Sequence, residues 1–401
     1  MEEYLTKYDF LYKGSNTKFL SDKQYDWFPE EWSDFFRDNN LDFNELKGLL
    51  LSNQIECPQT LVDFIQKSRQ LTELKDTTES TPRISKENNK INYKKQAELY
   101  GMSSIVSKLC IKHNIKRVVD VGCGVGHLLR AIQCHLPNLE YIGIECDTIL
   151  CEKATNNSNG VHSNIKFVKL RIDLTTDPKV VEGIFCPENG ATAIISLHGC
   201  GDLQQTLFDI YLSLPKEKNP LIVSVGCCYH KMVNHIPVFV NNSVWSVQAL
   251  RLACQERLSY FRLMSQDDHQ RRKVQFINRA KIECLFEFLS IDRTLMKRNV
   301  VRKLKFENID TREKLFSLLK VGNVDELDKI VVDIQNVNNA NEYLVEPFNF
   351  LQFLMQGVLE TKLLTDRIKY LQQKDAAVVC TFGTICDSTI SPRNMAIICY
   401  R

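Results

Sequence analysis

The stretch VVDVGCGVGHL, residues 118–128, most constrains the fold, because it places Gly122, Gly124 and Gly126 directly after an apolar run. Glycine lacks a side chain, so such a turn lets the backbone approach a bound ligand closely. A dinucleotide fingerprint has the spacing GxGxxG, and His127 stands here where its third glycine is expected. The spacing therefore disfavours a nicotinamide or flavin cofactor.

Alternating helix and strand patterns surround this turn. Continuous apolar runs are typical of strands in a sheet covered on both faces, whereas residues 97–113 and 127–136 have helical spacing. Strands are predicted at residues 116–121, 139–145, 164–173, 191–197 and 221–226. The series is βαβ, and it predicts an α/β fold with a parallel, doubly wound sheet.

The C-terminal segment predicts a different connection. Residues 375–383 and 394–401 form two apolar runs, and the loop between them is too short for the crossover helix that a parallel pair needs. They are expected to form an antiparallel hairpin that completes the sheet. This combination resembles the Rossmann-like sheet of class I methyltransferases that use S-adenosylmethionine.

The length of 401 residues, 44% of them hydrophobic, predicts about two or three structural units. Aromatic, leucine-rich helical patterns come first, and a polar segment then reads as a linker or lid. The predicted units are an N-terminal helical unit (1–74), a linker (75–95), a methyltransferase core (96–228), a mainly helical insertion (229–373) and the hairpin (374–401).

Composition excludes several classes of protein. The first residues lack the basic start and apolar run of a signal peptide, and no run of about 18 apolar residues follows. We therefore expect an intracellular protein, cytoplasmic or nuclear, that does not contact a membrane. Its 15 cysteines include no CxxC pair, which argues against a disulfide framework and a zinc ribbon. The net charge of +2 does not identify a partner.

The donor suggested by this sheet has an amino-acid end, a sulfonium, a ribose and an adenine. Asp120 is expected near the amino-acid end, and Gly122, Cys123 and Gly124 form the turn that the donor approaches. Glu145 stands 23 positions after Gly122, at the end of the second strand, where a carboxylate accepts ribose hydroxyl groups.

Two further acids are candidates for donor binding. Asp147 is the alternative ribose acid. Asp173, after the third strand, is placed to meet the adenine amino group, but an aspartate there also suits a turn or a helix N-cap.

The acceptor side is predicted at SLHGCGDL (196–203) and SVGCCYHKM (224–232), which end the fourth and fifth strands and therefore face one cleft. His198, Asp202 and His230 are the candidates for a base or for a residue that orients the substrate. Alternatively, Asp202 caps the next helix and His230 is packed or exposed. Tyr229 stacks on a base or belongs to the core.

The same two motifs contain residues that could bind a metal ion. Cys200, Cys227, Cys228 and His230 lie at adjacent strand ends, and thiolate with imidazole suits zinc. Neighbouring cysteines on a strand point to opposite faces, so both are not expected to bind one ion. S-adenosylmethionine is thus predicted as the cofactor, without a metal.

Four motifs, VVDVGCGVGHL, LHGCGDL, VGCCYH and SPRNMAIICYR, resemble the methyltransferase-like protein 25 family, one branch of which is called ribosomal RNA adenine dimethylase domain-containing. The resemblance covers residues 93–401 and implies donor binding through Asp120, Gly122, Gly124 and Glu145. Many relatives carry a lysine in the glycine turn, where Cys123 and Val125 stand here. Donor affinity is expected to differ accordingly.

The acceptor stays open at this stage. Residues 198–202 replace the Asn-Pro-Pro or Asp-Pro-Pro type of motif that adenine N6 methylation uses, which disfavours that reaction. A more distant similarity to transfer RNA 2'-O-methyltransferases favours RNA, bound through Arg271, Arg272 and Lys273; a solvated helix face is the alternative. Protein or small-molecule acceptors remain possible.

A different class of function is a donor-binding protein with little catalysis that acts as an interaction or regulatory module. Its partner would bind the N-terminal helical unit, whose aromatic residues include Trp27, Phe28 and Trp32. Aromatic residues at helical spacing also suit core packing.

Overall fold

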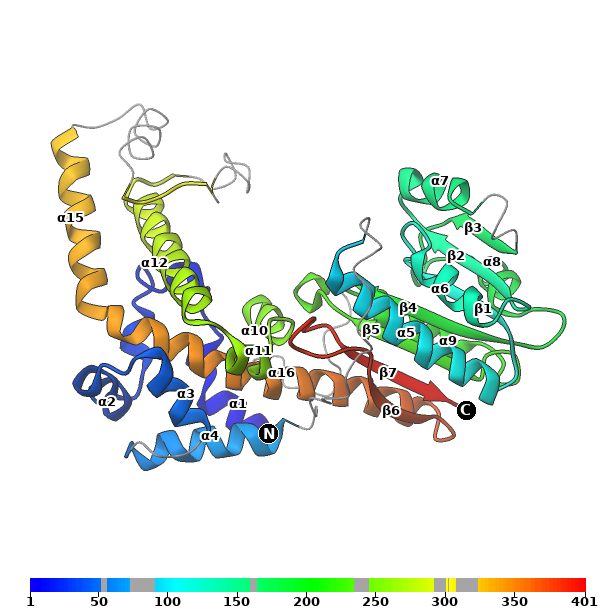
Figure 1. Cartoon of the computed structure of the whole chain (residues 1–401), viewed down its shortest axis with the longest axis horizontal. Coiled ribbons are helices and arrows are strands. Elements are labelled where there is room, and N and C mark those ends of the chain that lie inside the picture. Colours follow the sequence, from blue (N-terminus) through cyan, green and yellow to red (C-terminus); the bar gives the residue numbers. More distant parts are fainter. Residues whose placement is uncertain are drawn as a thin grey trace. The chain divides into compact units, whose positions relative to one another are not determined.

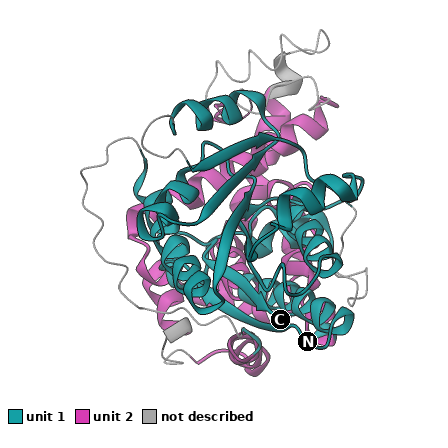
Figure 2. Ribbon diagram, turned by 90° about the vertical axis from the view of Figure 1, so that its right-hand side faces the viewer, with its two compact units in different colours: residues 1–2, 71–260, 356–401 teal, residues 3–70, 261–355 magenta. Residues whose placement is uncertain are grey.

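A computed structural model describes residues 1–51, 56–72, 91–158, 164–233, 245–291, 301, 303–307 and 324–401. The chain divides into two compact units (Figure 2). Unit 1 comprises residues 1–2, 71–260 and 356–401, and unit 2 comprises residues 3–70 and 261–355.

Unit 1 contains a seven-stranded sheet with the order β3-β2-β1-β4-β5-β7-β6 (Figure 1). The strands are β1 (Ile115–Val121), β2 (Glu140–Glu145), β3 (Ile165–Lys169), β4 (Ala191–Gly199), β5 (Leu221–Gly226), β6 (Val379–Thr384) and β7 (Met395–Tyr400). The first five strands pair in parallel, and β7 runs antiparallel to both β5 and β6. This is the strand order of class I methyltransferases, as the sequence predicts.

Helices cover both faces of the sheet because its central strands are apolar on both sides. On one face, α5 (Tyr93–Lys112) and α6 (His127–His135) share a core with Val118, Ala193 and Val223. The alternate residues Val119 and Ile194 are also fully buried, and α9 (Leu203–Ser213) packs against β4 and β5. Every residue of β5 is buried, as expected for a strand inside a parallel sheet.

Several helices of unit 1 begin at a side chain that caps their first turn. Asn92, Asp147 and Asp177 accept backbone N–H groups at the first turns of α5, α7 and α8. The further elements are α7 (Thr148–Asn156), α8 (Pro178–Phe185), η4 (Tyr229–Lys231), α10 (Val247–Ala253), α11 (Leu258–Leu263) and α16 (Val345–Lys374), with the last two passing into unit 2.

Two strands are shorter than the sequence predicts. The run expected at 164–173 leaves the sheet after Lys169, and the residues that follow line a cavity described below. The run expected at 375–383 joins the sheet only at Val379, because the Asp375 carboxylate accepts the N–H of Ala377 at 3.0 Å and closes a turn. A disulfide joins Cys380 to Cys399 across the hairpin.

Unit 2 combines the N-terminal helices with those of the insertion. Its helices are α1 (Glu2–Lys7), α2 (Glu30–Asn39), α3 (Phe43–Leu51), α4 (Gln59–Leu71), α12 (Gln266–Phe288), α15 (Val324–Asn341) and the start of α16. Phe19 packs against Phe276 and Phe348, with ring centroids 5.5 and 5.2 Å apart. The segments predicted as 1–74 and 229–373 therefore contribute to one aromatic core.

The N-terminal aromatic side chains belong largely to this core. Trp32 is fully buried beside Phe64, and Phe28 packs against Phe348. Residues 75–90 of the predicted linker lie outside the described residues, and α5 already begins at Tyr93. Within the described ranges, the helices lack the combination of length and apolar character that a membrane crossing requires.

Candidate active site

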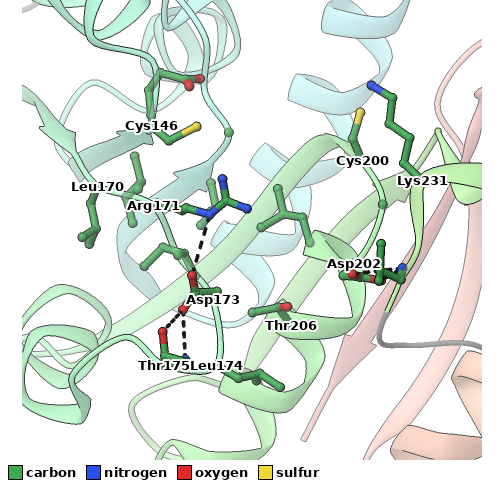
Figure 3. Close-up of a pocket in the computed structure, with 18 residues that line it drawn as sticks. Cys146, Leu170, Arg171, Asp173, Leu174, Thr175, Cys200, Asp202, Thr206 and Lys231 are labelled. Atoms are coloured by element: carbon green, nitrogen blue, oxygen red, sulfur yellow. Dashed lines mark hydrogen bonds and ion pairs between the residues drawn. The ribbon is translucent and has the colours of Figure 1, made fainter. Parts of the chain in front are cut away.

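A cavity of about 950 Å³ lies at the carboxyl ends of the parallel strands (Figure 3). Its wall includes Gly122 after β1, Glu145 at the end of β2, Asp173 after β3 and Asp202 after β4. The strand order reverses between β1 and β4, and ligands of doubly wound sheets bind at such a switch point. The cavity therefore occupies the position where this fold binds nucleotides.

The three glycines of the turn have different roles. All have left-handed backbone conformations, with φ of +77° at Gly122, +56° at Gly124 and +77° at Gly126. Gly122 lines the cavity, and a Cβ atom added to Gly124 would meet no heavy atom within 4 Å. A Cβ atom at Gly126 would lie 2.5 Å from the ring of Phe167. A side chain at Gly124 would thus enter open space and one at Gly122 would contact Leu203 at 3.5 Å, whereas Gly126 is needed for packing.

Cys123 turns its side chain away from the cavity. A Cβ atom added to Gly143 of β2 would lie 2.8 Å from the Cys123 sulfur, so the thiol packs against the sheet. Burial raises the pKa of this thiol. Neither Cys123 nor Gly124 is part of the cavity wall, so the turn meets the cavity at Gly122.

Glu145 connects the ends of the first two strands. Its Oε2 atom accepts the N–H of Gly124 at 2.9 Å, and its Oε1 atom accepts the N–H of Asp147 at 2.9 Å. Each carboxylate oxygen has a second lone pair for a ribose hydroxyl. Asp147, the alternative ribose acid, instead accepts the N–H of Leu150 and caps α7. Glu145 is the one of these two acids in the cavity wall.

Asp120 is buried at the end of β1, with 2% of its surface exposed. Its Oδ1 atom accepts no hydrogen bond from the described residues. Burial, and then the charge of Glu145, raise the pKa of Asp120 to about 7. A buried carboxylate oxygen without a partner is costly, and the ammonium of an amino acid is a ligand group that relieves this cost. Asp120 therefore fits the amino-acid end of S-adenosylmethionine.

Asp173 closes a turn and also lines the cavity. Its Oδ1 atom accepts the N–H and the hydroxyl of Thr175 at 2.9 and 2.6 Å. These bonds, with a smaller contribution from Arg171, lower the pKa of Asp173. Asp173 therefore has the turn role that the sequence analysis gave as an alternative. It also lies in the cavity wall, where a residue that recognises adenine is expected.

On the acceptor side, Asp202 joins two loops. Its carboxylate oxygens lie 3.0 and 3.2 Å from the N–H of Val233, which they accept as a hydrogen bond. The side chain does not cap α9. Asp202 therefore ties the loop after β4 to the loop after β5, inside the cavity wall.

The two histidines lie outside the cavity wall. His198 has a φ of +74°, and its Nε2 atom is 3.0 Å from Glu98 of α5. Glu98 also accepts the hydroxyl of Ser391 at 2.6 Å. Burial alone would raise the pKa of Glu98, but the bonds from His198 and Ser391 lower it overall. His230 faces Cys254, with 3.6 Å between Nδ1 and Sγ.

Tyr229 is a core residue rather than a stacking platform. Its side chain is 2% exposed, and the Arg367 guanidinium lies 5.1 Å from its ring centroid. Burial raises the pKa of its hydroxyl well above the ordinary value.

The sequence analysis did not identify four polar residues of the cavity wall, Arg171, Thr175, Thr206 and Lys231. Arg171 follows β3, and Lys231 lies within the quoted motif SVGCCYHKM. For Arg171 and Lys231, the position shortly after the carboxyl end of a strand is the signal that identifies them, whereas Thr206 lies within α9.

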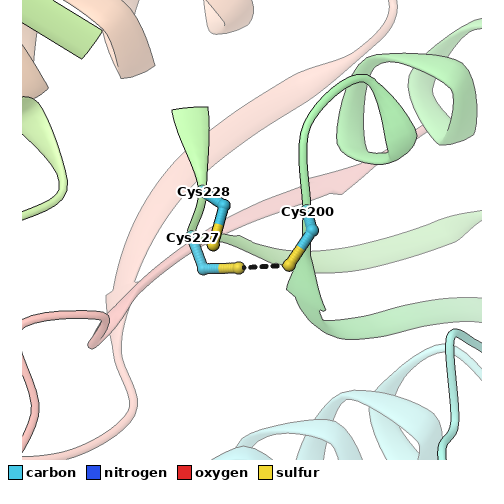
Figure 4. Close-up of side chains that lie close together, drawn as sticks. All are labelled: Cys200, Cys227 and Cys228. Carbon is cyan, nitrogen blue, oxygen red and sulfur yellow. Dashed lines mark hydrogen bonds between the residues drawn. The ribbon is translucent and has the colours of Figure 1, made fainter. Parts of the chain in front are cut away.

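The cysteines at the strand ends lie closer together than expected. The sulfur atoms of Cys200, Cys227 and Cys228 are within 4.8 Å of one another, and those of Cys200 and Cys227 are 2.8 Å apart (Figure 4). The expected divergence of neighbouring strand residues does not apply, because β5 ends at Gly226 and both later cysteines follow it.

The basic residues of α12 have acidic neighbours. Arg271, whose side chain is 71% exposed, pairs with Asp268. Lys273 is 19% exposed and lies 2.9 Å from Glu346 and 3.1 Å from Glu342. Much of the positive charge on this helix is therefore compensated within unit 2.

Parts of this chain are similar to known proteins. Residues 94–235 match the family described as a methyltransferase domain. The Mus musculus protein named "Probable methyltransferase-like protein 25" is 24% identical over 221 residues, which cover 51% of this chain and 36% of that protein. The chain thus spans about a third of the length of this curated relative.

Two solved structures are also similar in part. Plantazolicin methyltransferase BpumL in complex with SAH is 12% identical, with a TM-score of 0.25 over 59% of this chain and 75% of that one. The sugar N-methyltransferase KedS8 from Streptoalloteichus is 15% identical, with a TM-score of 0.23 over 32% and 48%. The strand order and the match over residues 94–235 identify a class I methyltransferase domain, in a chain that is similar over about half of its length to methyltransferase-like protein 25.

Proposed function

We propose that this chain transfers the methyl group of S-adenosylmethionine to an acceptor that enters the cavity beside Asp202. The observation that carries the proposal is the buried Oδ1 atom of Asp120, which has no hydrogen-bond partner among the described residues and lies next to the glycine turn that Glu145 holds. An apolar cavity with a few convergent polar groups is the usual form of such a site.

Each donor-binding residue has a separate task. Asp120 binds the ammonium, Glu145 accepts the ribose hydroxyls, and Asp173 accepts the adenine amino group. Hydrogen bonds to a charged acceptor contribute roughly 1.5 to 3 kcal/mol each. Apolar side chains from the strand ends exclude water around the donor; they include Val121, Ile144, Leu170, Ile172 and Leu203.

When bound, the donor supplies an electrophilic methyl group, and the protein's remaining task is to align the acceptor and remove its proton. Asp202 is the first candidate for that base, because its carboxylate lies in the cavity wall. His198 and His230 lie outside the wall, and we assign them to positioning the two loops.

RNA is the acceptor class that we favour, with contacts through Arg271 and Arg272 on α12. Arg171 and Lys231 support this choice, since they add positive charge to the cavity wall where a phosphate backbone would pass. Lys273 is held by two glutamates, and we assign it to the stability of unit 2 instead.

Calorimetric titration of the chain with S-adenosylmethionine tests the donor site. Glu145→Ala should weaken binding by about 10- to 100-fold, which corresponds to the loss of one charged acceptor. Glu140→Ala is the matched control, because this acid lies at the other end of β2, where it pairs with Arg117 on the surface. The control should bind the donor as the wild type does.

A transfer assay with labelled donor tests the reaction, using fractionated RNA and protein from cell extracts as acceptors. Asp202→Asn keeps an oxygen that accepts the N–H of Val233, so it should bind the donor normally but transfer methyl groups more slowly. The absence of donor binding to the folded chain would contradict the proposal. Donor binding without transfer to any fraction would instead favour the regulatory module.

A further inference from the structure

Three thiols gather at the edge of the donor cavity although they come from two separate loops. Cys200 follows β4, whereas Cys227 and Cys228 follow β5. Gly199 and Gly226, the residues just before them, are partners in the parallel pairing of these strands. The sheet itself therefore brings the three sulfur atoms within 4.8 Å of one another (Figure 4).

The two loops are held together by further contacts. The Asp202 carboxylate accepts the N–H of Val233, as described above. Gly201 has a φ of +58°, and a Cβ atom there would lie 3.0 Å from the backbone oxygen of Lys231. The backbones on either side of the thiols thus touch directly, which gives the cluster a frame that does not depend on a ligand.

We propose that Cys200, Cys227 and Cys228 bind a thiophilic metal ion, Zn²⁺ in the first place, as three thiolates. Tetrahedral zinc with bonds of about 2.3 Å to sulfur places its sulfur ligands roughly 3.8 Å apart. The sulfur atoms of Cys200 and Cys227 are now 2.8 Å apart. Rotation of these side chains would increase that distance to the one that zinc requires. Soft sulfur ligands select against Mg²⁺ and Ca²⁺.

Binding exchanges three thiol protons for one divalent cation, without any change in oxidation state. The resulting centre has a net charge of −1. Lys231 lies beside Cys200 on the cavity wall, where its ammonium offsets that charge (Figure 3). Three sulfur ligands from the protein leave a fourth coordination position.

We place the fourth position on the side of the cavity, because Cys200 is the ligand that lines it. Cys227 is 3% exposed, whereas Cys200 is exposed and lines the cavity. Three protein ligands with an open position are typical of catalytic rather than structural zinc sites. We therefore propose that the ion binds a water molecule or an electron-rich group of the acceptor at this position, beside the donor.

Cobalt titration of the reduced, metal-free chain of 401 residues under anaerobic conditions tests this site. Co²⁺ should bind with a stoichiometry of one per chain, give the near-ultraviolet absorption of cobalt–thiolate bonds, and be displaced by Zn²⁺. Cys200→Ser and Cys228→Ser should each lose this absorption. Cys146→Ser is the matched control, since it removes an exposed cavity thiol outside the cluster and should bind cobalt as the wild type does.

Circular dichroism and the donor titration show whether each variant is folded, which matters most for the buried Cys227. Absence of cobalt–thiolate absorption in the folded wild type would overturn the proposal, as would absorption that survives both serine variants. A disulfide between Cys200 and Cys227 that forms in preference to metal binding would also overturn it. Donor binding is measured separately, so failure of the metal site is distinguishable from failure of the methyltransferase proposal.

Discussion

The Glu145 carboxylate accepts the backbone N–H of Gly124 at 2.9 Å, so the acid that ends β2 also holds the glycine turn that follows β1. One side chain therefore fixes the shape of the turn and presents lone pairs to the cavity. Loss of Glu145 is expected to disturb both functions, which is why its effect on donor binding should exceed that of Asp173, an acid already engaged with Thr175.

Substitution of alanine for two of the glycines should separate strain from packing. Gly124→Ala places a side chain at a φ of +56° but in open space, so we expect a loss of about 1 to 2 kcal/mol in the free energy of unfolding. Gly126→Ala adds a collision with the Phe167 ring to similar strain and should cost more. Urea denaturation of both variants measures this difference. Equal losses would show that Phe167 does not constrain the turn.

Donor binding should depend on pH through Asp120. Its pKa is raised to about 7 by burial and by Glu145, so the free protein holds a proton there below pH 7. The donor ammonium favours the ionised form, and affinity should therefore rise by up to about tenfold per pH unit as pH increases toward 7. Titrations between pH 6 and 7.5 measure this slope.

Asp120→Asn is the control for that experiment. The variant should bind the donor more weakly and without the rise in affinity toward pH 7. In the chain without donor, the raised pKa of Asp120 makes the stability of the fold decrease, not increase, with pH. The reason is that the folded state binds more protons than the unfolded state between the ordinary pKa of 3.8 and about 7. Asp120 thus makes the unliganded protein less stable as pH rises through that window. A flat pH profile of donor affinity in the wild type would contradict this role.

Glu98→Gln should lower the stability of the domain at neutral pH. The pKa of Glu98 is lowered because the bonds from His198 and Ser391 outweigh its burial. Such a group stabilises the fold above its unfolded pKa, and this contribution is lost as pH falls through the folded pKa. The free energy of unfolding of Glu98→Gln should therefore be lower than that of the wild type at pH 7, and this difference should be smaller at pH 4. An equal difference at both values would exclude the ionised carboxylate as its cause.

The basic residues of α12 should divide into two groups. Replacing Arg271 and Arg272 together with alanine should weaken RNA binding and reduce its dependence on salt, because fewer phosphate charges are neutralised. Lys273→Ala should instead reduce thermal stability, since it leaves Glu342 and Glu346 without their lysine partner. Filter binding at several salt concentrations and thermal denaturation distinguish these effects. Unchanged RNA binding in the double variant would remove α12 as a contact.

The seven strands and the glycine turn could be predicted from the sequence because their signals are local. Continuous apolar runs identify strands buried on both faces, and the short final loop identifies the antiparallel hairpin. Glu145 was identifiable for the same reason, because it stands at the end of a strand at a fixed distance from Gly122.

Features that depend on distant segments were not predictable in this way. The contact between Phe19 and Phe276 makes one core from two segments that the sequence separates into different domains. His198 points toward Glu98 because its backbone is left-handed, a conformation that a non-glycine residue seldom signals in advance. The acids around Lys273 come from elements more than 60 residues away.

The Phe167 ring lies where a Cβ atom at either Gly126 or Gly143 would be, with closest approaches of 2.5 and 2.6 Å. An aromatic side chain on β3 thus occupies the space that two glycines on other segments leave empty. These three positions should change together during evolution: a homologue with a larger residue in place of either glycine should carry a smaller side chain than phenylalanine on β3. Substitutions in the glycine turn and on the third strand are therefore expected to be correlated, even though Phe167 does not line the cavity.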